Sequence, residues 1–370
     1  MEIQTYEQYA EGGRIRIASV SSLLAEALFS WFGDRLETPV EIEQLRRELK
    51  VTDANNKLFI ALLNILERND YLSNNNGFVQ KASFDEDALK QRAEKLHRQG
   101  LATYGKGQWL EDAVKPSFEL ARACIPQLPE LLRGELTSVQ LLFSAENYQR
   151  STAIYEAHLQ EVYYGLIAQQ IIKKCHEIWA KEPDRQIRIL EVGAGSGKGT
   201  IRMLEGLRAY GNKVHFSFTD IGNSFLRRAK KTFKDFDCDL DFRLLDISDD
   251  PATQGFEAES FDIAFATNVV HATPDLRVTL NNMQKLLRRG GNVYINEITE
   301  DMAANTVTYG TTPGWWLPAD GLRLPYCPVA TTTTFRSLLA ELGFTEVEVV
   351  GYPGVPEPEL AQAIIQGIKK

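Results

Sequence analysis

A glycine-rich run directly after an apolar segment constrains the fold of this chain more than any other feature. The apolar segment is Ile187–Val192, which is typical of a buried strand, and the run is Gly193-Ala-Gly-Ser-Gly-Lys198. Glycines let the backbone turn tightly and let a ligand touch it. The helix expected after Gly199 begins with unpaired N–H groups. We therefore expect a strand, a ligand-binding turn and a helix in succession.

Strand-like and helical segments alternate from this point to the end of the chain. Alternation of this kind predicts an open, mostly parallel sheet with helices on both faces. The further expected strands are 214–219, 241–245, 261–266, 292–297, 347–350 and 363–368. The expected helices follow Gly199 and Ser224 and cover 276–288 and 333–342, with a loop-rich stretch after Glu297.

The first 82 residues have the outline of a winged helix. Helical spacing predicts helices from Ala18 to about Arg47, the second of them opening at Thr38-Pro-Val, and a third from about Asn55 to Arg68. A hairpin is expected around the turn Asn74–Gly77. Winged helices often bind DNA, but the third helix has few basic residues. Packing or dimerisation is the favoured role.

Residues 83–182 are expected to be mostly helical. Pro126 and Pro129 should break the helix in the stretch Phe118–Leu136. A long helix is expected from about Glu146 to Lys181, and Tyr155 lies along it. The third expected region, 183–370, holds the alternating strands and helices.

Composition excludes several classes of protein. The 370 residues include 41 Lys and Arg against 50 Asp and Glu, giving a net charge of −9, and 44% are hydrophobic. Such a chain is neither disordered nor a disulfide scaffold, and its acidity argues against a nucleic-acid partner. The four cysteines are far apart, no long uncharged apolar run is apparent, and the N-terminus does not resemble a signal peptide. We expect a cytoplasmic protein without a metal site or a membrane span; its oligomeric state is unknown.

Three ligand classes use a glycine-rich turn of this kind, and the spacing separates them. The dinucleotide pattern GxGxxG fails because its third glycine would be Lys198. The P-loop pattern fails at Val192 and at Gly199, although Gly197-Lys198 keeps a phosphotransferase as a rival. An acidic residue followed by Gly-x-Gly-x-Gly fits without exception, with Glu191 as the acid.

Two further acids follow the next two expected strands. Asp220 ends the second strand, where a carboxylate accepts hydrogen bonds from both ribose hydroxyls of an adenosine ligand. Asp246 ends the third strand, in a position to accept from an adenine amino group. Together they favour an adenosine-containing ligand over a bare glycine-rich turn.

Three downstream segments carry a family resemblance: Asn268-Val-Val-His271-Ala-Thr273, Gly290-Gly291 through Glu297-Ile-Thr299, and Tyr309-Gly-Thr-Thr-Pro-Gly-Trp315-Trp316. The set closely resembles the methyltransferase domains of polyketide synthases and hybrid synthases, and the likeness covers nearly the whole chain. The chain departs from that family at Gly195-Ser-Gly-Lys198, where the family usually has GTGG, and at Gly165, where an Asn is usual.

The resemblance implies an α/β fold with a Rossmann-like class I methyltransferase core. It implies a seven-stranded, mostly parallel sheet, a helical N-terminal lid with the winged-helix-like segment, and a substrate loop at 300–330. The implied cofactor is S-adenosylmethionine, with S-adenosylhomocysteine as product. The residues expected to bind it are Glu191, Gly193, Ala194, Gly195, Gly197, Asp220, Ile221, Asp246, Ile247 and Asn268.

The resemblance also implies a catalytic pair of His271 and Glu297. An imidazole removes a proton from an activated carbon or a hydroxyl, and a carboxylate behind it fixes the tautomer. The implied substrate is an acyl chain on a carrier protein or a polyketide synthase module, with Tyr155, Trp315 and Trp316 near it. We expect methylation of the α-carbon of a β-ketoacyl thioester. O-methylation of a hydroxyl, a P-loop phosphotransferase and a non-catalytic protein that keeps the fold are the alternatives.

Overall fold

The computed structural model describes residues 5–104, 112–236 and 238–370, so parts of the expected N-terminal and helical regions, residues 1–4 and 105–111, lie outside the described residues. The chain forms two compact units. The first holds the chain up to Gln160 with Asp301–Trp316 and Pro325–Cys327; the second holds Glu161–Glu300, Leu317–Leu324 and Pro328–Lys370. The three-region division expected from the sequence stays a prediction.

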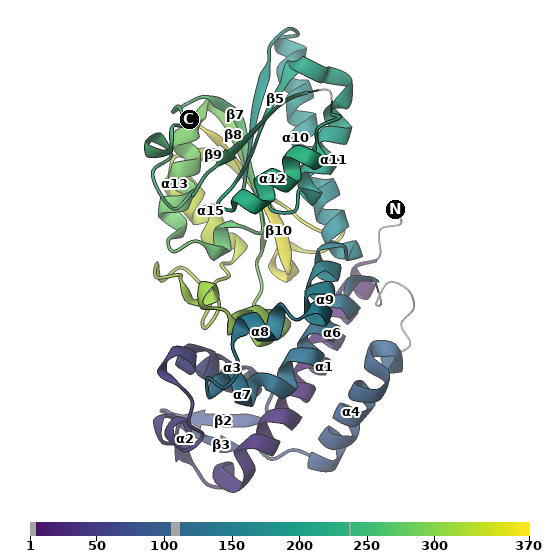
Figure 1. Cartoon of the computed structure of the whole chain (residues 1–370), viewed down its shortest axis with the longest axis vertical. Helices are drawn as coiled ribbons and strands as arrows, with labels where there is room; N and C mark the ends of the chain where they lie inside the picture. Colours follow the sequence, from purple (N-terminus) through teal and green to yellow (C-terminus); the bar gives the residue numbers. More distant parts are fainter. Residues whose placement is uncertain (1–4, 105–111, 237) are drawn as a thin grey trace. The chain divides into compact units, whose positions relative to one another are not determined.

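The first unit consists of helices and a small antiparallel sheet (Figure 1). The sheet has the order β1-β3-β2, and the turn of its hairpin is the expected one, closed by a 3.1 Å bond from the Gly77 N–H to the Asn74 side chain. The elements are α1 Tyr6–Phe32, β1 Val40–Glu41, α2 Ile42–Glu48, α3 Asn56–Arg68, β2 Leu72–Asn75, β3 Phe78–Lys81, α4 Glu86–Gln99, α6 Lys115–Cys124, α7 Leu128–Leu132, α8 Ser138–Leu142, α9 Ala145–Tyr155 and α14 Ala303–Thr308.

The core of this unit gathers leucines and phenylalanines from α1, α3, α6 and α7, and α14 closes it with Val307. Helix α1 continues as one turn of tighter helix to Leu36. By length and composition alone Tyr6–Leu36 would be able to cross a membrane, but 56% of its apolar window is buried, as in the core helix of a folded domain. The expectation of no membrane span stays a prediction.

Several helical boundaries differ from the sequence expectation, and the first helix, α1, begins at Tyr6 rather than at Ala18. Val40–Glu41 is a strand paired with β3, so the second helix begins at Ile42 rather than at Thr38-Pro-Val. The long helix expected from Glu146 to Lys181 is two helices, because backbone bonds tighten to three-residue spacing at Glu156 and Ala157. The break expected at Pro126 and Pro129 is confirmed, between α6 and α7.

The second unit is built on a seven-stranded sheet of order β6-β5-β4-β7-β8-β10-β9. All neighbours pair in parallel except β10, which runs antiparallel between β8 and β9. Its strands are β4 Ile187–Val192, β5 Val214–Asp220, β6 Asp239–Leu244, β7 Phe261–Thr267, β8 Leu287–Ile298, β9 Phe344–Val350 and β10 Gln362–Lys369. The expected mostly parallel seven-stranded sheet is therefore confirmed.

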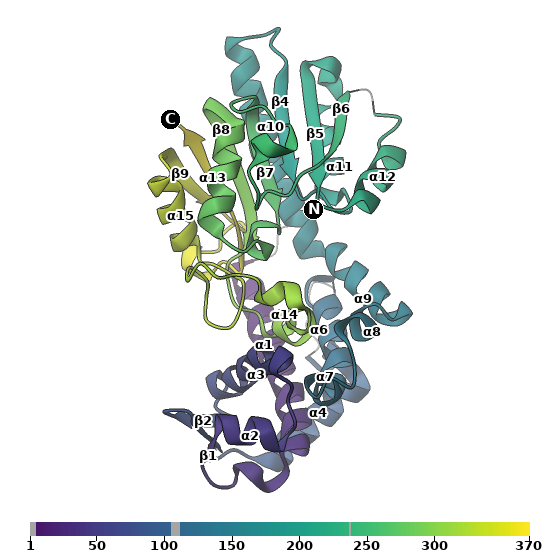
Figure 2. The same cartoon turned by 60° about the vertical axis from the view of Figure 1, so that its left-hand side comes forward.

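Helices cover both faces of this sheet, as Figure 2 shows: α10, α11 and α12 on one side, α13 and α15 on the other. Helix α10 is tied to the sheet by Tyr163, which is buried and donates its hydroxyl hydrogen to the backbone carbonyl of Gln362. The bounds are α10 His158–Lys181, α11 Lys198–Leu207, α12 Asn223–Thr232, α13 Leu276–Leu286 and α15 Thr332–Glu341.

The strand order fixes where a ligand can bind in this unit. The chain runs from β4 outward to β5 and β6, then crosses to β7 on the other side of β4. At such a reversal the loops after β4 and β7 separate, and the crevice they leave lies beyond the carboxyl ends of the strands. The glycine-rich turn follows β4 and the His271 segment follows β7, so both border this position.

Candidate active site

The glycine-rich turn after β4 adopts a backbone that only glycine tolerates easily. Gly193 has φ +64°, and a Cβ there would lie 2.6 Å from Val269 Cγ2. Gly197 has φ +79°, and a Cβ there would lie 2.9 Å from the Phe233 ring. Ala194 joins the turn to β5 through a 2.9 Å bond from its N–H to the Thr219 carbonyl. The turn therefore presents bare backbone at the sheet edge, which is what close approach of a ligand needs.

Glu191 lies beneath this turn, at the end of β4. Its side chain is buried, and the Thr200 hydroxyl at the start of α11 donates to its Oε2 at 2.6 Å. Burial raises the pKa of Glu191 to about 8, against the smaller opposing effect of the Thr200 hydrogen bond. A cationic ligand group brought next to this carboxyl would favour its ionised form.

Asp220 ends β5 and organises two neighbouring loops. One carboxylate oxygen accepts from the Gly195 N–H at 2.9 Å, and the other accepts from the Gly222 N–H at 2.7 Å. A carboxylate has about four lone-pair sites, so each oxygen can still accept from a ligand hydroxyl. Asp220 thus links the glycine turn to the loop that follows β5.

The structure places the remaining predicted cofactor residues on the loops after β5 and β6. Ile221 is 73% exposed, which leaves an apolar side chain beside Asp220. Asp246 is exposed and held by Gln254, whose side chain accepts from the Asp246 N–H and donates to its carbonyl, both at 2.8 Å. Ile247 is buried, and its carbonyl accepts from Asn282 at 2.9 Å.

Asn268 and Val269 connect the cofactor turn to the predicted catalytic pair. Asn268 has a positive φ of 53°, which Asn tolerates better than most residues, and its N–H bonds the Asn296 carbonyl of β8 at 2.8 Å. Val269 packs against Gly193 and donates its own N–H to Glu297 Oε1 at 2.7 Å. The two parts of the site are therefore contiguous.

His271 and Glu297 form the hydrogen-bonded pair expected from neighbouring strands. His271 Nδ1 lies 2.7 Å from Glu297 Oε2, and the His271 N–H lies 3.3 Å from Glu297 Oε1. The Glu297 side chain is fully buried, whereas that of His271 is 20% exposed. Because Nδ1 donates to the carboxylate, Nε2 keeps its lone pair, as a general base requires.

Tyr155, Trp315 and Trp316 belong to the first unit. Tyr155 ends α9 and is 44% exposed. Trp316 donates its indole N–H to the Gly310 carbonyl at 2.8 Å, and Lys57 donates to the Trp316 carbonyl at 3.3 Å. The Trp315 indole N–H is buried and has no hydrogen-bond partner among the described residues. Their role toward a substrate stays a prediction.

Sequence reasoning missed several residues that shape the site. Thr200 and Gln254 hold predicted cofactor residues, and Arg323 with Asp320 holds the His271 segment. In the sequence, Thr200 is a hydroxyl at the third position of α11 and Gln254 a glutamine eight residues after Asp246, and neither pattern indicates a site residue strongly. Arg323 and Asp320 lie in a loop-rich stretch where no periodicity points to them.

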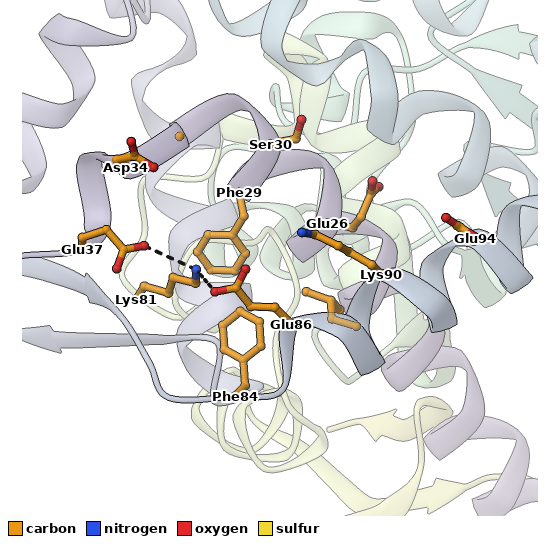
Figure 3. Close-up of a pocket in the computed structure, with 12 residues that line it drawn as sticks. Glu26, Phe29, Ser30, Asp34, Glu37, Lys81, Phe84, Glu86, Lys90 and Glu94 are labelled. Atoms are coloured by element: carbon orange, nitrogen blue, oxygen red, sulfur yellow. Dashed lines mark hydrogen bonds and ion pairs between the residues drawn. The ribbon is translucent and has the colours of Figure 1, made fainter.

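A pocket of about 460 Å³ lies elsewhere, in the first unit (Figure 3). Five of its twelve lining residues are acidic, and the Lys81 amine lies beside the rings of Phe29 and Phe84, 5.8 Å from the centre of each. The ion pair with Glu86 raises the pKa of Lys81. The pocket has none of the glycine-turn features of the site in the second unit.

Comparisons with known proteins show which family the chain resembles. The profile of a family described as a methyltransferase domain matches residues 190–293. Polyketide synthase ThaQ of Burkholderia thailandensis is 32% identical over 243 residues, which are 65% of this chain and 12% of the synthase. The crystal structure of the DszA carbon methyltransferase is 27% identical with a TM-score of 0.83, over 98% of this chain and 91% of that one. The CurJ carbon methyltransferase is 28% identical with a TM-score of 0.80, over 98% and 93%.

The fold, the glycine turn and these matches define a class I S-adenosylmethionine-dependent methyltransferase, with S-adenosylmethionine as its cofactor. It is a methyltransferase of the polyketide synthase type, as the resemblance implied. The P-loop phosphotransferase alternative is accordingly set aside. The chain spans 7% to 12% of the length of eight curated relatives that it matches, so the activities, substrates and partners of whole synthases are proposals here.

Proposed function

We propose that this methyltransferase methylates the α-carbon of a β-ketoacyl thioester carried by an acyl carrier protein or a polyketide synthase module. The observation that carries the proposal is the His271–Glu297 hydrogen bond beside the glycine turn. Carbon methylation needs a base that removes an α-proton, and the pair supplies one. The two carbon methyltransferases of similar fold add support.

The residues around the glycine turn fit S-adenosylmethionine. A Cβ at Gly193 or Gly197 would collide with the Val269 or Phe233 side chain, so the turn needs glycine there, and Asp220 keeps acceptor capacity for two hydroxyls. In this proposal Asp220 holds the ribose, Asp246 and the apolar Ile221 and Ile247 hold the adenine, and Glu191 with the turn faces the methionine end. The cofactor supplies an electrophilic methyl group when bound.

His271 Nε2 takes one proton from the α-carbon of the substrate. The electron pair left on that carbon forms the new carbon–carbon bond as the methyl group is transferred, and S-adenosylhomocysteine is the co-product. Glu297 keeps the Nδ1 proton in place and stabilises the imidazolium. The main remaining task of the site is to align the two reactants, because alignment removes much of the entropic barrier.

The remaining parts of the proposal rest on the resemblance. Tyr155, Trp315 and Trp316 contact the acyl chain, residues 83–182 act as a lid and residues 300–330 as a substrate loop. A cytoplasmic location also remains a prediction.

Intact-mass spectrometry of carrier-bound chains tests the proposal. We expect a gain of one methyl group, about 14 Da, on a β-ketoacyl chain with the wild-type protein and S-adenosylmethionine, since α-proton removal by a positioned base is needed. The variant H271A should bind S-adenosylmethionine within about twofold of wild type and give no product. A gain confined to a β-hydroxyacyl chain would contradict carbon methylation and favour the O-methylation alternative.

A further inference from the structure

The segment Leu317–Leu324 contains a buried ion pair whose two side chains hydrogen-bond to backbone of the His271 turn and the start of α13. Asp320 and Arg323 lie 3.0 Å apart, and their side chains are 2% and 6% exposed. The segment is also joined by a 2.9 Å bond from the Ala319 N–H to the Pro274 carbonyl. All of these residues belong to the second unit, as His271 does.

Each member of the pair holds backbone of the segment that carries His271. Arg323 Nη1 donates to the His271 carbonyl at 3.3 Å, and Nη2 donates to the Thr273 carbonyl at 3.0 Å. A third bond, 2.7 Å long, reaches the Pro328 carbonyl. Asp320 accepts from the Leu276 N–H at 2.8 Å, at the start of α13. One guanidinium therefore spans three backbone carbonyls and a carboxylate.

Stability alone does not explain such a pair. Removing two charges from water costs several kcal/mol, and apolar replacements of buried ion pairs are often neutral or stabilising. Burial lowers the pKa of the Arg323 guanidinium from its ordinary value, although Asp320 opposes the shift. The cost of burying the charge is consistent with a pair retained for the geometry that it imposes.

That geometry concerns His271 directly. Glu297 holds the His271 N–H and its ring from the sheet side, while Arg323 holds its carbonyl from the loop side. A base that is misplaced by about 1 Å loses on the order of 100-fold in rate, so both anchors matter. We propose that Arg323, locked by Asp320, is a positioning residue that fixes the His271 ring for proton abstraction. This inference rests on the proposed function.

The variant R323K separates positioning from folding. Lysine keeps the charge, but it is a point donor and cannot span the same carbonyls in a fixed fork. We expect kcat for methyl transfer to fall at least tenfold per folded molecule, while the dissociation constant of S-adenosylmethionine, measured by calorimetry, stays within twofold. Deuterium exchange at the substrate α-carbon, measured with S-adenosylhomocysteine bound and corrected for the spontaneous exchange without protein, should slow by the same factor, since it reports proton abstraction without methyl transfer.

Arg336 supplies a matched control. It also forms a two-bond ion pair, with Glu357, and also donates to a backbone carbonyl, that of Val347 at 3.1 Å. R336K should keep kcat and α-proton exchange within twofold of wild type. If R323K does not fold, D320N provides the test, with an expected threefold or larger loss of both rates at unchanged cofactor affinity.

The outcomes are distinct. If the wild-type protein catalyses neither α-proton exchange nor methylation of any β-ketoacyl chain, the proposed function is overturned. If the wild type is active and folded R323K keeps kcat and α-proton exchange within twofold of it, the positioning role alone is overturned. The same result for D320N overturns it where R323K does not fold. Faster amide exchange in residues 269–273 of R323K, together with the lower kcat, would support it.

Discussion

Replacing Glu297 by glutamine should remove most of the activity while leaving the fold in place. The carboxylate accepts from three donors, the Val269 N–H, the His271 N–H and the ring Nδ1–H. Glutamine has one acceptor oxygen and an NH₂ group that only donates. The backbone donors cannot turn away, so the oxygen faces them and the NH₂ faces the ring. His271 then carries its proton on Nε2, the wrong tautomer for a base.

The size of the effect follows from the loss of base catalysis. General base catalysis contributes about 10²- to 10⁴-fold, so kcat for E297Q should fall by that factor, about 3–5 kcal/mol. A lost hydrogen bond to a charged group costs about 1.5–3 kcal/mol of stability, partly offset because a buried charge is removed. The unfolding free energy should therefore drop by no more than about 3 kcal/mol.

Single-turnover mass spectrometry of carrier-bound β-ketoacyl chains measures this rate, with calorimetry for S-adenosylmethionine affinity and urea unfolding for stability. E357Q is the control, because Glu357 also accepts more than one hydrogen bond, here two from Arg336 of α15, away from the His271 turn. A folded E297Q with a rate within threefold of wild type would refute the assignment of the pair.

Three further predictions concern the cofactor turn. D220N should raise the dissociation constant of S-adenosylmethionine roughly 10- to 100-fold by calorimetry and leave kcat at saturation within about threefold, because it loses an acceptor for ribose; unchanged affinity would contradict the ribose assignment. G193A should lower the unfolding free energy by about 1–3 kcal/mol more than the control G354A does, because both glycines have a positive φ but only a Cβ at Gly193 meets a neighbour, Val269. Equal losses in the two variants would contradict the contact with Val269. The raised pKa of Glu191 means that the folded state holds a proton that the unfolded state has lost, so stability should fall as pH rises from about 4.5 through about 8. In E191Q the unfolding free energy, measured with urea, should differ less between pH 5 and pH 9 than in the wild type. An unchanged difference would contradict the raised pKa of Glu191.

Much of the second unit was predictable because its signals are local. Strand β4, the glycine turn and Asp220 follow one another within a single strand–helix–strand unit, and each has a residue type that its backbone or chemistry demands. The pairing of His271 with Glu297 was implied by the family resemblance, and it fits neighbouring parallel strands, which bring their carboxyl ends to one edge. The adenosine-type ligand followed from the glycine turn with Asp220 and Asp246, and the family from the resemblance of three downstream segments.

Features that depend on distant contacts were not predictable. Strand β10 inserts between β8 and β9 in antiparallel register, and nothing in its apolar run specifies that neighbour. The break between α9 and α10 has neither glycine nor proline to mark it. Arg323 finds its carbonyl partners about fifty residues earlier in the chain, from a loop without periodicity.

The central claim is that the new bond joins two carbon atoms, and one measurement tests it most directly. A carrier-bound β-ketoacyl chain labelled with carbon-13 at the α-carbon is incubated with the wild-type protein and S-adenosylmethionine labelled at its methyl carbon. Carbon NMR of the product should show a one-bond coupling between the two labelled carbons, because His271 frees the electron pair of the α-carbon for that bond. A labelled methyl signal without that coupling would place the methyl group on an atom other than the α-carbon and contradict the account.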